Sequence, residues 1–198
     1  MIKHGDLVFS QIGSDLNAIS AVTEGFKGAR VNHMGVIVEN SKGLFVLEAF
    51  PPEVRVTQLD VFLRRAADPE DGRLRYLVGR IQPTLKHLLS PAVAYGLKQR
   101  DIPYDDLYLT DTAALYCSEL VVDMFRHANG GQDFFVEHPM SFRDLNSGDV
   151  HPAWIEYYAK FGMDVPEGEP GSNPGTISKD LRLEIVSIQG PPAGYSDN

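Results

Sequence analysis

The chain has 198 residues, 43% of them hydrophobic and 23% charged, which fits one globular domain with a sizeable core and no bilayer-spanning apolar run. The formal net charge of −9 argues against nucleic-acid binding, because phosphate recognition depends on a basic surface. The single cysteine excludes an intramolecular disulfide and a thiolate zinc cage.

The first half of the chain is predicted to consist mainly of strands. Apolar and alternating runs predict strands over residues 6–12, 31–39, 44–50, 54–56 and 74–81. The clearest pair is a hairpin turning at residues 40–43, and Pro51-Pro52 ends its second strand because proline cannot donate to a central ladder. Two helices are expected, over residues 15–23 with Leu16 on the apolar face, and over residues 57–66.

The second half is predicted to be helical, with loops. Ser90-Pro91 opens a helix that runs to about Arg100, and a strongly apolar helix ends at Asn129-Gly130-Gly131. Aromatic residues in 134–165 predict a short helix packed on the sheet, and 166–175 has the composition of a loop. A last strand is expected over 181–188. The predicted class is therefore α+β, a mostly antiparallel sheet with helices on it, as one domain over 1–190 and a flexible tail over 191–198.

The hairpin brings two polar residues to one face of the sheet. With a turn at residues 40–43, the residue numbers of each antiparallel pair sum to 83. Glu48 therefore lies opposite Gly35 and diagonally beside His33. Because Gly35 has no side chain, the carboxylate and the imidazole have room to share a hydrogen bond, which would fix the tautomer of the ring and raise its basicity. The other face of the hairpin is wholly apolar.

Two interpretations of this polar pair stay open at the level of the hairpin. The first is a functional pair, and it depends on the register, since a three-residue loop would put the two residues on opposite faces. The second is a surface histidine at a strand end and a solvated carboxylate, which is the commoner fate of polar residues on a strand.

The lone cysteine, Cys117, also allows two interpretations. If its helix begins near Asp111, Cys117 is an interior residue and an inert core thiol, as buried free cysteines usually are. If the helix begins near Cys117, the sulfur lies at the positive end of the helix dipole, where a thiolate is stabilised and nucleophilic. A histidine beside it would then complete an ion pair.

The order of four motifs resembles a known enzyme family. These are Gly5-Asp6-Leu7-Val8-Phe9, Asn32-His33-Met34-Gly35-Val36-Ile37-Val38, Val46-Leu47-Glu48-Ala49 and Tyr116-Cys117-Ser118-Glu119-Leu120-Val121. Together they resemble the circularly permuted NlpC/P60 papain-like family, and more narrowly the YiiX-like permuted amidases. In ordinary NlpC/P60 enzymes the cysteine helix precedes the Gly-Asp-Leu strand and the histidine strand, whereas here it follows them.

The resemblance implies roles for particular residues. Cys117 would be the nucleophile, His33 its base and Glu48 the third member that orients the ring. Tyr104, in Ile102-Pro103-Tyr104, would line the site, and Tyr116 stands where the unpermuted enzymes carry Asp, so their specificity does not transfer. The resemblance favours a helix that starts at the cysteine, and it implies a papain-like fold.

The expected activity is hydrolysis of an amide through a thioester on Cys117, by a Cys-His-Glu triad without a metal or other cofactor. A small peptide, an amino-acid amide or an acyl compound is the expected substrate, a cell-wall peptide among them. The alternatives are an acyltransferase or lipid hydrolase of the lecithin-retinol acyltransferase type and a non-catalytic binding domain. A cytoplasmic location is expected for this chain, and a periplasmic or secreted one if a leader was removed. The sequence does not indicate an oligomeric state.

Overall fold

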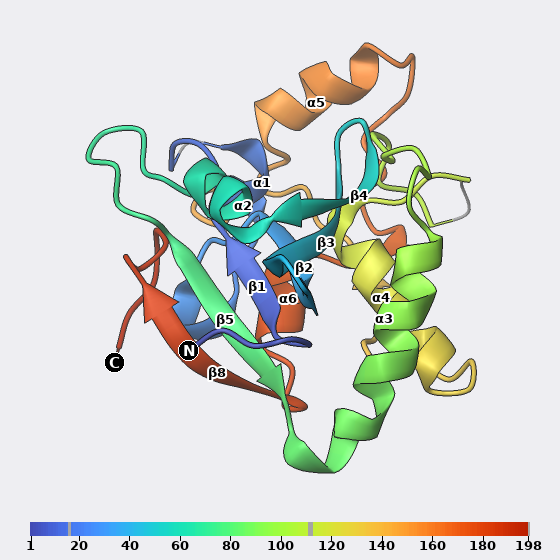
Figure 1. Ribbon diagram of the computed structural model, residues 1–198. Helices are drawn as coiled ribbons and strands as arrows, with labels where there is room; N and C mark the ends of the chain where they lie inside the picture. The colour runs from blue at the N-terminus through green and yellow to red at the C-terminus, as the bar shows by residue number, and fades with distance from the viewer. Residues whose placement is uncertain (16, 111–112, 198) are drawn as a thin grey trace.

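Six antiparallel strands form the main sheet of the molecule, with helices on both of its faces (Figure 1). The computed structural model describes residues 1–15, 17–110 and 113–197. The strand order is β4-β3-β2-β1-β5-β8, and each neighbouring pair is antiparallel. The predicted α+β class is confirmed. The strands are β1 (Leu7–Ser10), β2 (His33–Asn40), β3 (Gly43–Phe50), β4 (Glu53–Gln58), β5 (Tyr76–Ile81) and β8 (Leu183–Gln189).

The helices are α1 (Ala18–Val22), α2 (Leu59–Arg65), α3 (Leu89–Lys98), α4 (Cys117–Ala128), α5 (Pro152–Ala159) and α6 (Pro174–Ser178), with 3-10 turns η1 (Phe26–Gly28) and η2 (Pro83–Leu88). The expected start of α1 near Asp15 is wrong by three residues, because the Asn17 side chain accepts hydrogen bonds from the amides of Ile19 and Ser20 and caps the helix there. Leu16 lies outside the described residues.

The β2–β3 hairpin has the predicted register. Val36 pairs with Leu47 and Asn40 with Gly43, so partner numbers sum to 83. A Cβ on Gly35 would approach Val46 Cγ1 to 2.5 Å and Glu48 Cβ to 3.2 Å, so this position is restricted to glycine by packing. The register places successive residues of each strand on opposite faces of the sheet.

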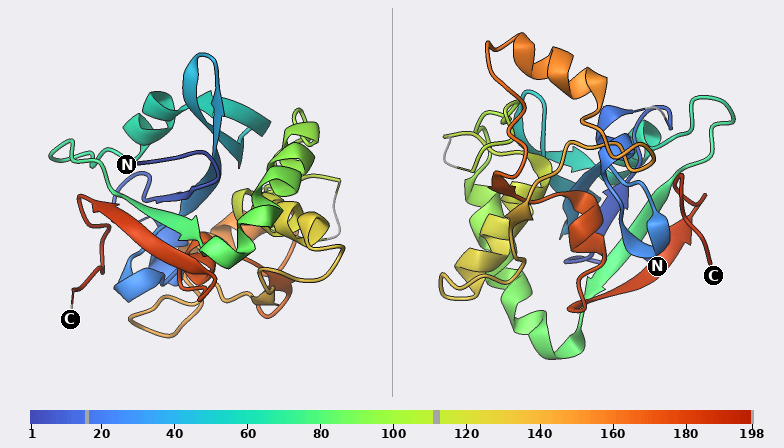
Figure 2. Two further views of the ribbon diagram at one scale, coloured as in Figure 1. Left: turned by 60° about the horizontal axis from the view of Figure 1, so that its bottom comes forward. Right: turned by 180° about the vertical axis from the view of Figure 1, so that it is seen from behind.

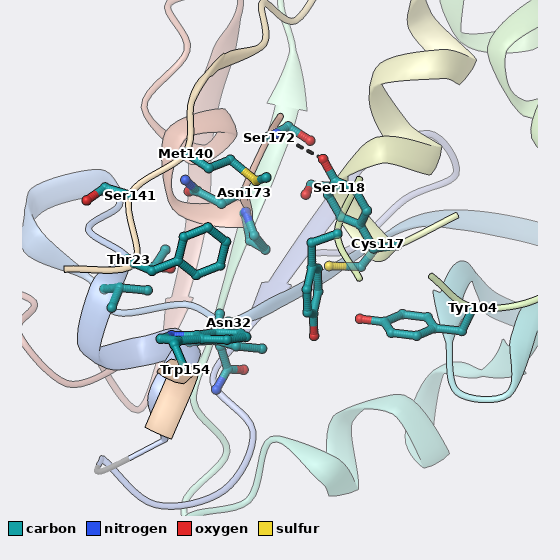
Figure 3. A pocket seen from close by; sticks show the side chains of 16 residues that line it. Thr23, Asn32, Tyr104, Cys117, Ser118, Met140, Ser141, Trp154, Ser172 and Asn173 are labelled. Carbon is teal, nitrogen blue, oxygen red and sulfur yellow. Dashed lines mark hydrogen bonds between the residues drawn. The ribbon is translucent and has the colours of Figure 1, made fainter. Parts of the chain in front are cut away.

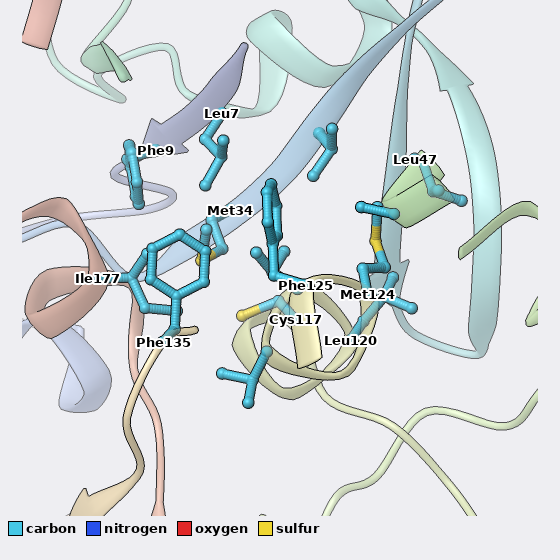
Figure 4. Close-up of a cluster of buried hydrophobic side chains, with 14 of the residues drawn as sticks. Leu7, Phe9, Met34, Leu47, Cys117, Leu120, Met124, Phe125, Phe135 and Ile177 are labelled. Carbon is cyan, nitrogen blue, oxygen red and sulfur yellow. The ribbon is translucent and has the colours of Figure 1, made fainter. Parts of the chain in front are cut away.

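One face of the hairpin belongs to the main apolar core, which α4 covers (Figure 4). Met34, Leu47, Leu120, Met124 and Phe125 are fully buried there. The helix α3 packs beside α4, and a Cβ on Gly96 of α3 would come within 2.7 Å of Leu47 and of Met124, so the two helices and the sheet meet without spare volume.

The opposite face of the hairpin is covered by α2. Phe62 of α2 is buried there against Val8, Ile37 and Val46. The amphipathic α2 follows β4 directly, so the chain crosses from the edge of the sheet onto this face in a single step (Figure 1).

The expectation that the aromatic residues of 134–165 pack a helix on the sheet is wrong. The helix α5 packs against α1 and the loop before α4: the Trp154 indole donates to the carbonyl of Ala18, and the Tyr158 hydroxyl donates to the carbonyl of Leu107. These aromatic side chains form a small cluster of their own, and α5 stands away from the sheet at the edge of the molecule (Figure 1).

The segment predicted as a loop over 166–175 contains two short elements. Its strand β7 (Pro170–Gly171) pairs with β6 (His138–Pro139), and α6 begins at Pro174 because the Asn173 side chain caps the amide of Thr176. The helix α6 contacts α4 and lies behind the main sheet (Figure 2).

The segment that follows β8 makes hydrogen bonds with the body of the domain. The Ala193 amide donates to Gln11 Oε1 at 2.7 Å, and the Ala193 carbonyl accepts from the amide of Arg30 at 2.8 Å. The predicted boundary at residue 190 and the flexible tail remain predictions, and Asn198 lies outside the described residues.

Candidate active site

The lone cysteine is the first residue of α4. Tyr116 is the N-cap residue, and its amide donates to Glu119 Oε2 at 3.3 Å, so the carboxylate of the third helical residue reaches back over the start of the helix. This cap decides between the two helix starts that the sequence allows, in favour of the later one. The sulfur of Cys117 therefore lies at the positive end of a helix of 12 residues.

His33 and Glu48 meet on the α2 face of the hairpin, as its register predicts. The Nε2 atom of His33 and the Oε2 atom of Glu48 are 2.6 Å apart, and only 4% of His33 and none of Glu48 is exposed. His33 is the first residue of β2, so its ring stands at the end of the strand, and interaction with Cys117 contributes to the raised pKa of the ring. Since Nε2 faces Glu48, Nδ1 is the ring nitrogen left for the sulfur.

The buried carboxylate of Glu48 has further partners beyond the imidazole. Its Oε1 atom accepts a hydrogen bond from the Thr57 hydroxyl at 2.6 Å and one from Arg65 Nη2 at 2.5 Å. Arg55 lies more distantly, 4.0 Å from the same oxygen. Both carboxylate oxygens are thus occupied, which compensates for the removal of this charge from water.

Aromatic rings enclose this polar network. The His33 ring packs edge-on against Phe50 at 5.1 Å between centroids and lies 5.4 Å from Phe62 of α2. The Arg65 guanidinium lies 4.0 Å from the centre of the Phe50 ring. Phe50 and Phe62 therefore exclude water from the imidazole, while the cation–π contact holds Arg65 over the carboxylate.

The partners of His33 determine its protonation. Burial alone would lower the pKa of His33, but hydrogen bonds and charge interactions with Cys117 and Glu48 raise it to about 9. Burial likewise opposes the charge on Glu48, yet the bond to His33, the positive charges of His33 and Arg65 and the bond from Thr57 lower the pKa of Glu48. The imidazole is therefore protonated and the carboxylate ionised near neutral pH.

The sulfur of Cys117 opens onto a pocket between α4, α1 and the segments that carry α5 and α6 (Figure 3). The space between atoms there, including the open mouth, is about 540 Å³. Aromatic side chains form much of its wall, among them Tyr108, Phe142 and Trp154. A pocket lined by aromatic side chains beside a buried ionisable pair is typical of a small-molecule site.

Tyr104 and Tyr116, the two predicted substrate-binding residues, both line this pocket. Burial and the neighbouring Tyr108 raise the pKa of Tyr104 well above its usual value, so the hydroxyl stays neutral. Tyr116 is only 2% exposed, and its hydroxyl accepts a hydrogen bond from the amide of Ser172 at 3.0 Å. Its oxygen thus already joins the start of α4 to the segment before α6.

The sequence interpretation missed the outer members of the network, Thr57, Arg65 and Phe50. A signal for Thr57 existed, because β4 pairs with β3 and Thr57 lies opposite Val46, on the same face as Glu48. No signal in the sequence placed Arg65 over the carboxylate, since its position depends on how α2 folds back onto the sheet. Asn32 was also missed: its side chain joins β2 to the loop at Ile12 and to Ser20 of α1 beside the pocket.

The remaining histidines lie apart from this site. His4 and His151 accept hydrogen bonds from backbone amides near them, and His127 stacks on Tyr95. Over residues 1–15, 17–110 and 113–197, no group of three or more His, Cys, Asp and Glu side chains is arranged to hold a metal ion. None of the helices in the same ranges is long and apolar enough to cross a membrane.

An antiparallel sheet packed on a helix that begins at a cysteine, with a histidine at the end of a neighbouring strand, defines a papain-like protein. The chain belongs to the family of permuted papain-like amidases, described as YaeF/YiiX, C92 family, whose model matches residues 1–187. The predicted resemblance is confirmed.

A solved structure of similar fold is described as the metalloprotein yiiX from Escherichia coli O157:H7. It is 23% identical to this chain, the match covers 96% of this chain and 98% of that one, and the TM-score is 0.75. At this level of identity the likeness establishes the fold alone. A search of curated proteins gave no match.

Proposed function

We propose that this chain is a cysteine amidase that cleaves the amide bond of a peptide or amino-acid amide through a thioester on Cys117. The observation that carries the proposal is the position of His33, whose Nε2 atom lies 2.6 Å from Glu48 Oε2 and whose pKa is raised by its interactions with Cys117 and Glu48. A nucleophile, a base and an orienting group in series form the arrangement that nucleophilic catalysis requires. Membership in an amidase family supports the same reaction class.

In the first half of the reaction, the Cys117 thiolate forms a bond to the carbonyl carbon of the substrate. The imidazolium of His33 then gives its proton to the leaving amine as the carbon–nitrogen bond breaks, which leaves an acyl thioester on the sulfur. Glu48 keeps the ring oriented and compensates its positive charge throughout. The pKa of about 9 for His33 supports this assignment, because a protonated imidazole is the form that stabilises a thiolate.

In the second half, water attacks the thioester. Neutral His33 takes a proton from that water, the carbon–sulfur bond breaks, and the acid product leaves with the thiolate–imidazolium pair restored. The amide of Cys117, as the first residue of α4, has no carbonyl partner within its own helix and is a suitable donor to the oxyanion of both tetrahedral intermediates.

The direct test is to trap the thioester. The protein is incubated with a panel of activated amides and esters of amino acids, short peptides and fatty acids, quenched in acid and analysed by mass spectrometry. We expect one acyl group on Cys117, which hydroxylamine removes, and turnover that favours the amino-acid and peptide compounds. Cys117→Ser and His33→Ala serve as the negative controls.

The other outcomes of this panel separate the alternatives. Acylation confined to the fatty-acyl esters, with transfer to an added amine or alcohol, would establish an acyltransferase or lipid hydrolase in place of the amidase. Absence of an acyl group from every compound, together with a thiol that iodoacetamide labels only after denaturation, would establish a non-catalytic domain.

A further inference from the structure

The pocket beside Cys117 has a wall whose polar atoms are largely engaged within the protein. The Trp154 indole donates to the carbonyl of Ala18, the Tyr116 hydroxyl accepts from the amide of Ser172, and the Asn32 amide is bonded to Ile12 and Ser20. The rings of Tyr104 and Tyr108 pack edge-on with their centroids 6.4 Å apart. To a bound molecule these side chains therefore offer mainly apolar and aromatic surface.

Two buried serines of the lining, Ser118 and Ser172, differ from these neighbours, because neither hydroxyl has a hydrogen-bond partner in the described part of the chain. Ser118 is the second residue of α4, next to Cys117, and none of its surface is exposed. A buried hydroxyl without a partner is uncommon in a folded protein, and it carries a desolvation cost that a bound polar atom relieves. Figure 3 places Ser118 beside the sulfur of Cys117.

Apart from the Cys117 sulfur, the lining of this pocket carries no charge. Among the described residues that line it there is no Asp, Glu, Lys, Arg or His. A charged group on the substrate would lose its water there and would find no carboxylate, ammonium or guanidinium partner in the lining, which is strongly unfavourable. The pocket therefore discriminates against both carboxylate and ammonium groups, whatever the net charge of the chain.

We infer that this pocket is a specificity site for an uncharged, mainly apolar or aromatic group that carries one hydrogen-bonding atom for Ser118. The inference rests on the proposed function, because it defines which part of an amide substrate is held beside Cys117. Within the substrate classes proposed above, it selects neutral aromatic or aliphatic amino-acid residues and disfavours acidic and basic ones.

The test uses substituted iodoacetamides, which alkylate a thiolate with loss of iodide and need no knowledge of the natural substrate. Iodoacetamide itself measures the reactivity of Cys117, and its N-benzyl derivative adds a neutral aromatic group. The N-(4-carboxybenzyl) and N-(4-aminomethylbenzyl) derivatives add a charge of either sign to the same ring. We expect the second-order rate for N-benzyl to exceed that of both charged reagents by about 100-fold, after correction for their rates with a free thiol.

The contribution of Ser118 is measured with the 3- and 4-hydroxybenzyl reagents. We expect the better of them to react about tenfold faster than N-benzyl with the wild-type protein, and Ser118→Ala to bring the ratio of the two rates to about one. Ser90→Ala, which removes an exposed hydroxyl on α3, is the matched control and should retain the preference.

The outcomes distinguish this inference from the proposed function. Slow reaction with every reagent, iodoacetamide included, would overturn the proposed function together with the inference. Fast reaction with iodoacetamide but equal rates for neutral and charged benzyl reagents would overturn the inference alone. A fast ammonium reagent beside a slow carboxylate would attribute the selectivity to the net negative charge of the chain and would also overturn it.

Discussion

The two faces of the β2–β3 hairpin are both buried, but one is apolar and the other carries charged side chains. Leu47 and Glu48 are neighbours in the chain and both are fully buried, but Leu47 packs under α4 and Glu48 lies under α2. The α4 face is apolar throughout. The α2 face holds a carboxylate, an imidazole and a guanidinium in contact with aromatic rings.

This difference separates stability from chemistry along one strand pair. Burial of apolar surface stabilises the α4 face without any need for exact partners. Each charge on the α2 face is tolerated only because another group compensates it, so the removal of a single partner is expected to change the remaining ones. Substitutions on the two faces should therefore give distinct experimental signatures.

The largest effect is expected at the point where the polar face meets α4. Cys117→Ala removes the proposed nucleophile, and we expect turnover of the best amide or ester to fall by at least about 1,000-fold. Because the sulfur is small and lies at a pocket, the midpoint of urea unfolding should change little. Steady-state kinetics and unfolding curves check the two halves of this prediction, and residual turnover near the wild-type rate would contradict it.

On the apolar face, Leu47→Ala should act on stability alone. It leaves a cavity between β3, α3 and Met124, so the free energy of unfolding should fall by about 2–5 kcal/mol. The pH dependence of Cys117 alkylation should stay at the wild-type position, since no group of the network is touched. A shift in that pH profile would contradict the separation of the two faces.

The charged groups on the α2 face should make the protein less stable as the pH rises into the alkaline range. The pKa of His33 is raised to about 9 from 6.5, so the protonated ring contributes stability that is fully present below pH 6.5 and is lost as the pH rises through 9. The free energy of unfolding of the wild type, relative to that of His33→Gln, should therefore fall by about 3 kcal/mol across this range.

Urea unfolding of both proteins at several pH values measures this difference. The lowered pKa of Glu48 acts in the opposite direction, because its contribution is present above pH 4.5 and is lost as the pH falls below that value. A difference between the two proteins that stays constant from pH 6.5 to 9 would contradict the assigned protonation of His33.

The smallest effect is expected from the outermost charge of the network. Arg65→Met keeps contact with Phe50 but removes a cation from Glu48, and we expect about a tenfold loss in the rate of thioester formation and a displaced pH profile. Arg64→Met is the matched control, because Arg64 is exposed and pairs with Asp60 on the surface. Arg65→Lys should recover part of the rate of thioester formation. Equal rates and equal pH profiles for Arg64→Met and Arg65→Met would show that Arg65 does not act on Glu48.

The sequence predicts local structure and the inner part of this site well. The turn at residues 40–43 is short, and β-strand periodicity then determines which residues share a face, so the proximity of His33 and Glu48 follows from spacing alone. The papain-like fold was implied by the resemblance of the four motifs to a known family, and the family match confirms it.

The outer part of the site depends on packing that spacing does not encode. Periodicity does not decide whether α4 begins near Asp111, which lies outside the described residues, or near Cys117. The bond from the Tyr116 amide to Glu119 caps the helix at Cys117. The position of α5 was mispredicted because its aromatic residues suit any apolar partner, and α1 with the Tyr108 loop provides one away from the sheet. Arg65 reaches Glu48 only once α2 is docked.

The most direct test of the account is the pH dependence of Cys117 alkylation by iodoacetamide in the native wild-type protein and in His33→Ala. A thiolate held by protonated His33 should react at pH 6 within a few-fold of its rate at pH 8, whereas the variant should react more than tenfold more slowly at pH 6 than at pH 8, as a thiol without a cationic partner does. Identical profiles for the two proteins, or labelling of the wild type only after denaturation, would contradict a functional link between this sulfur and this imidazole.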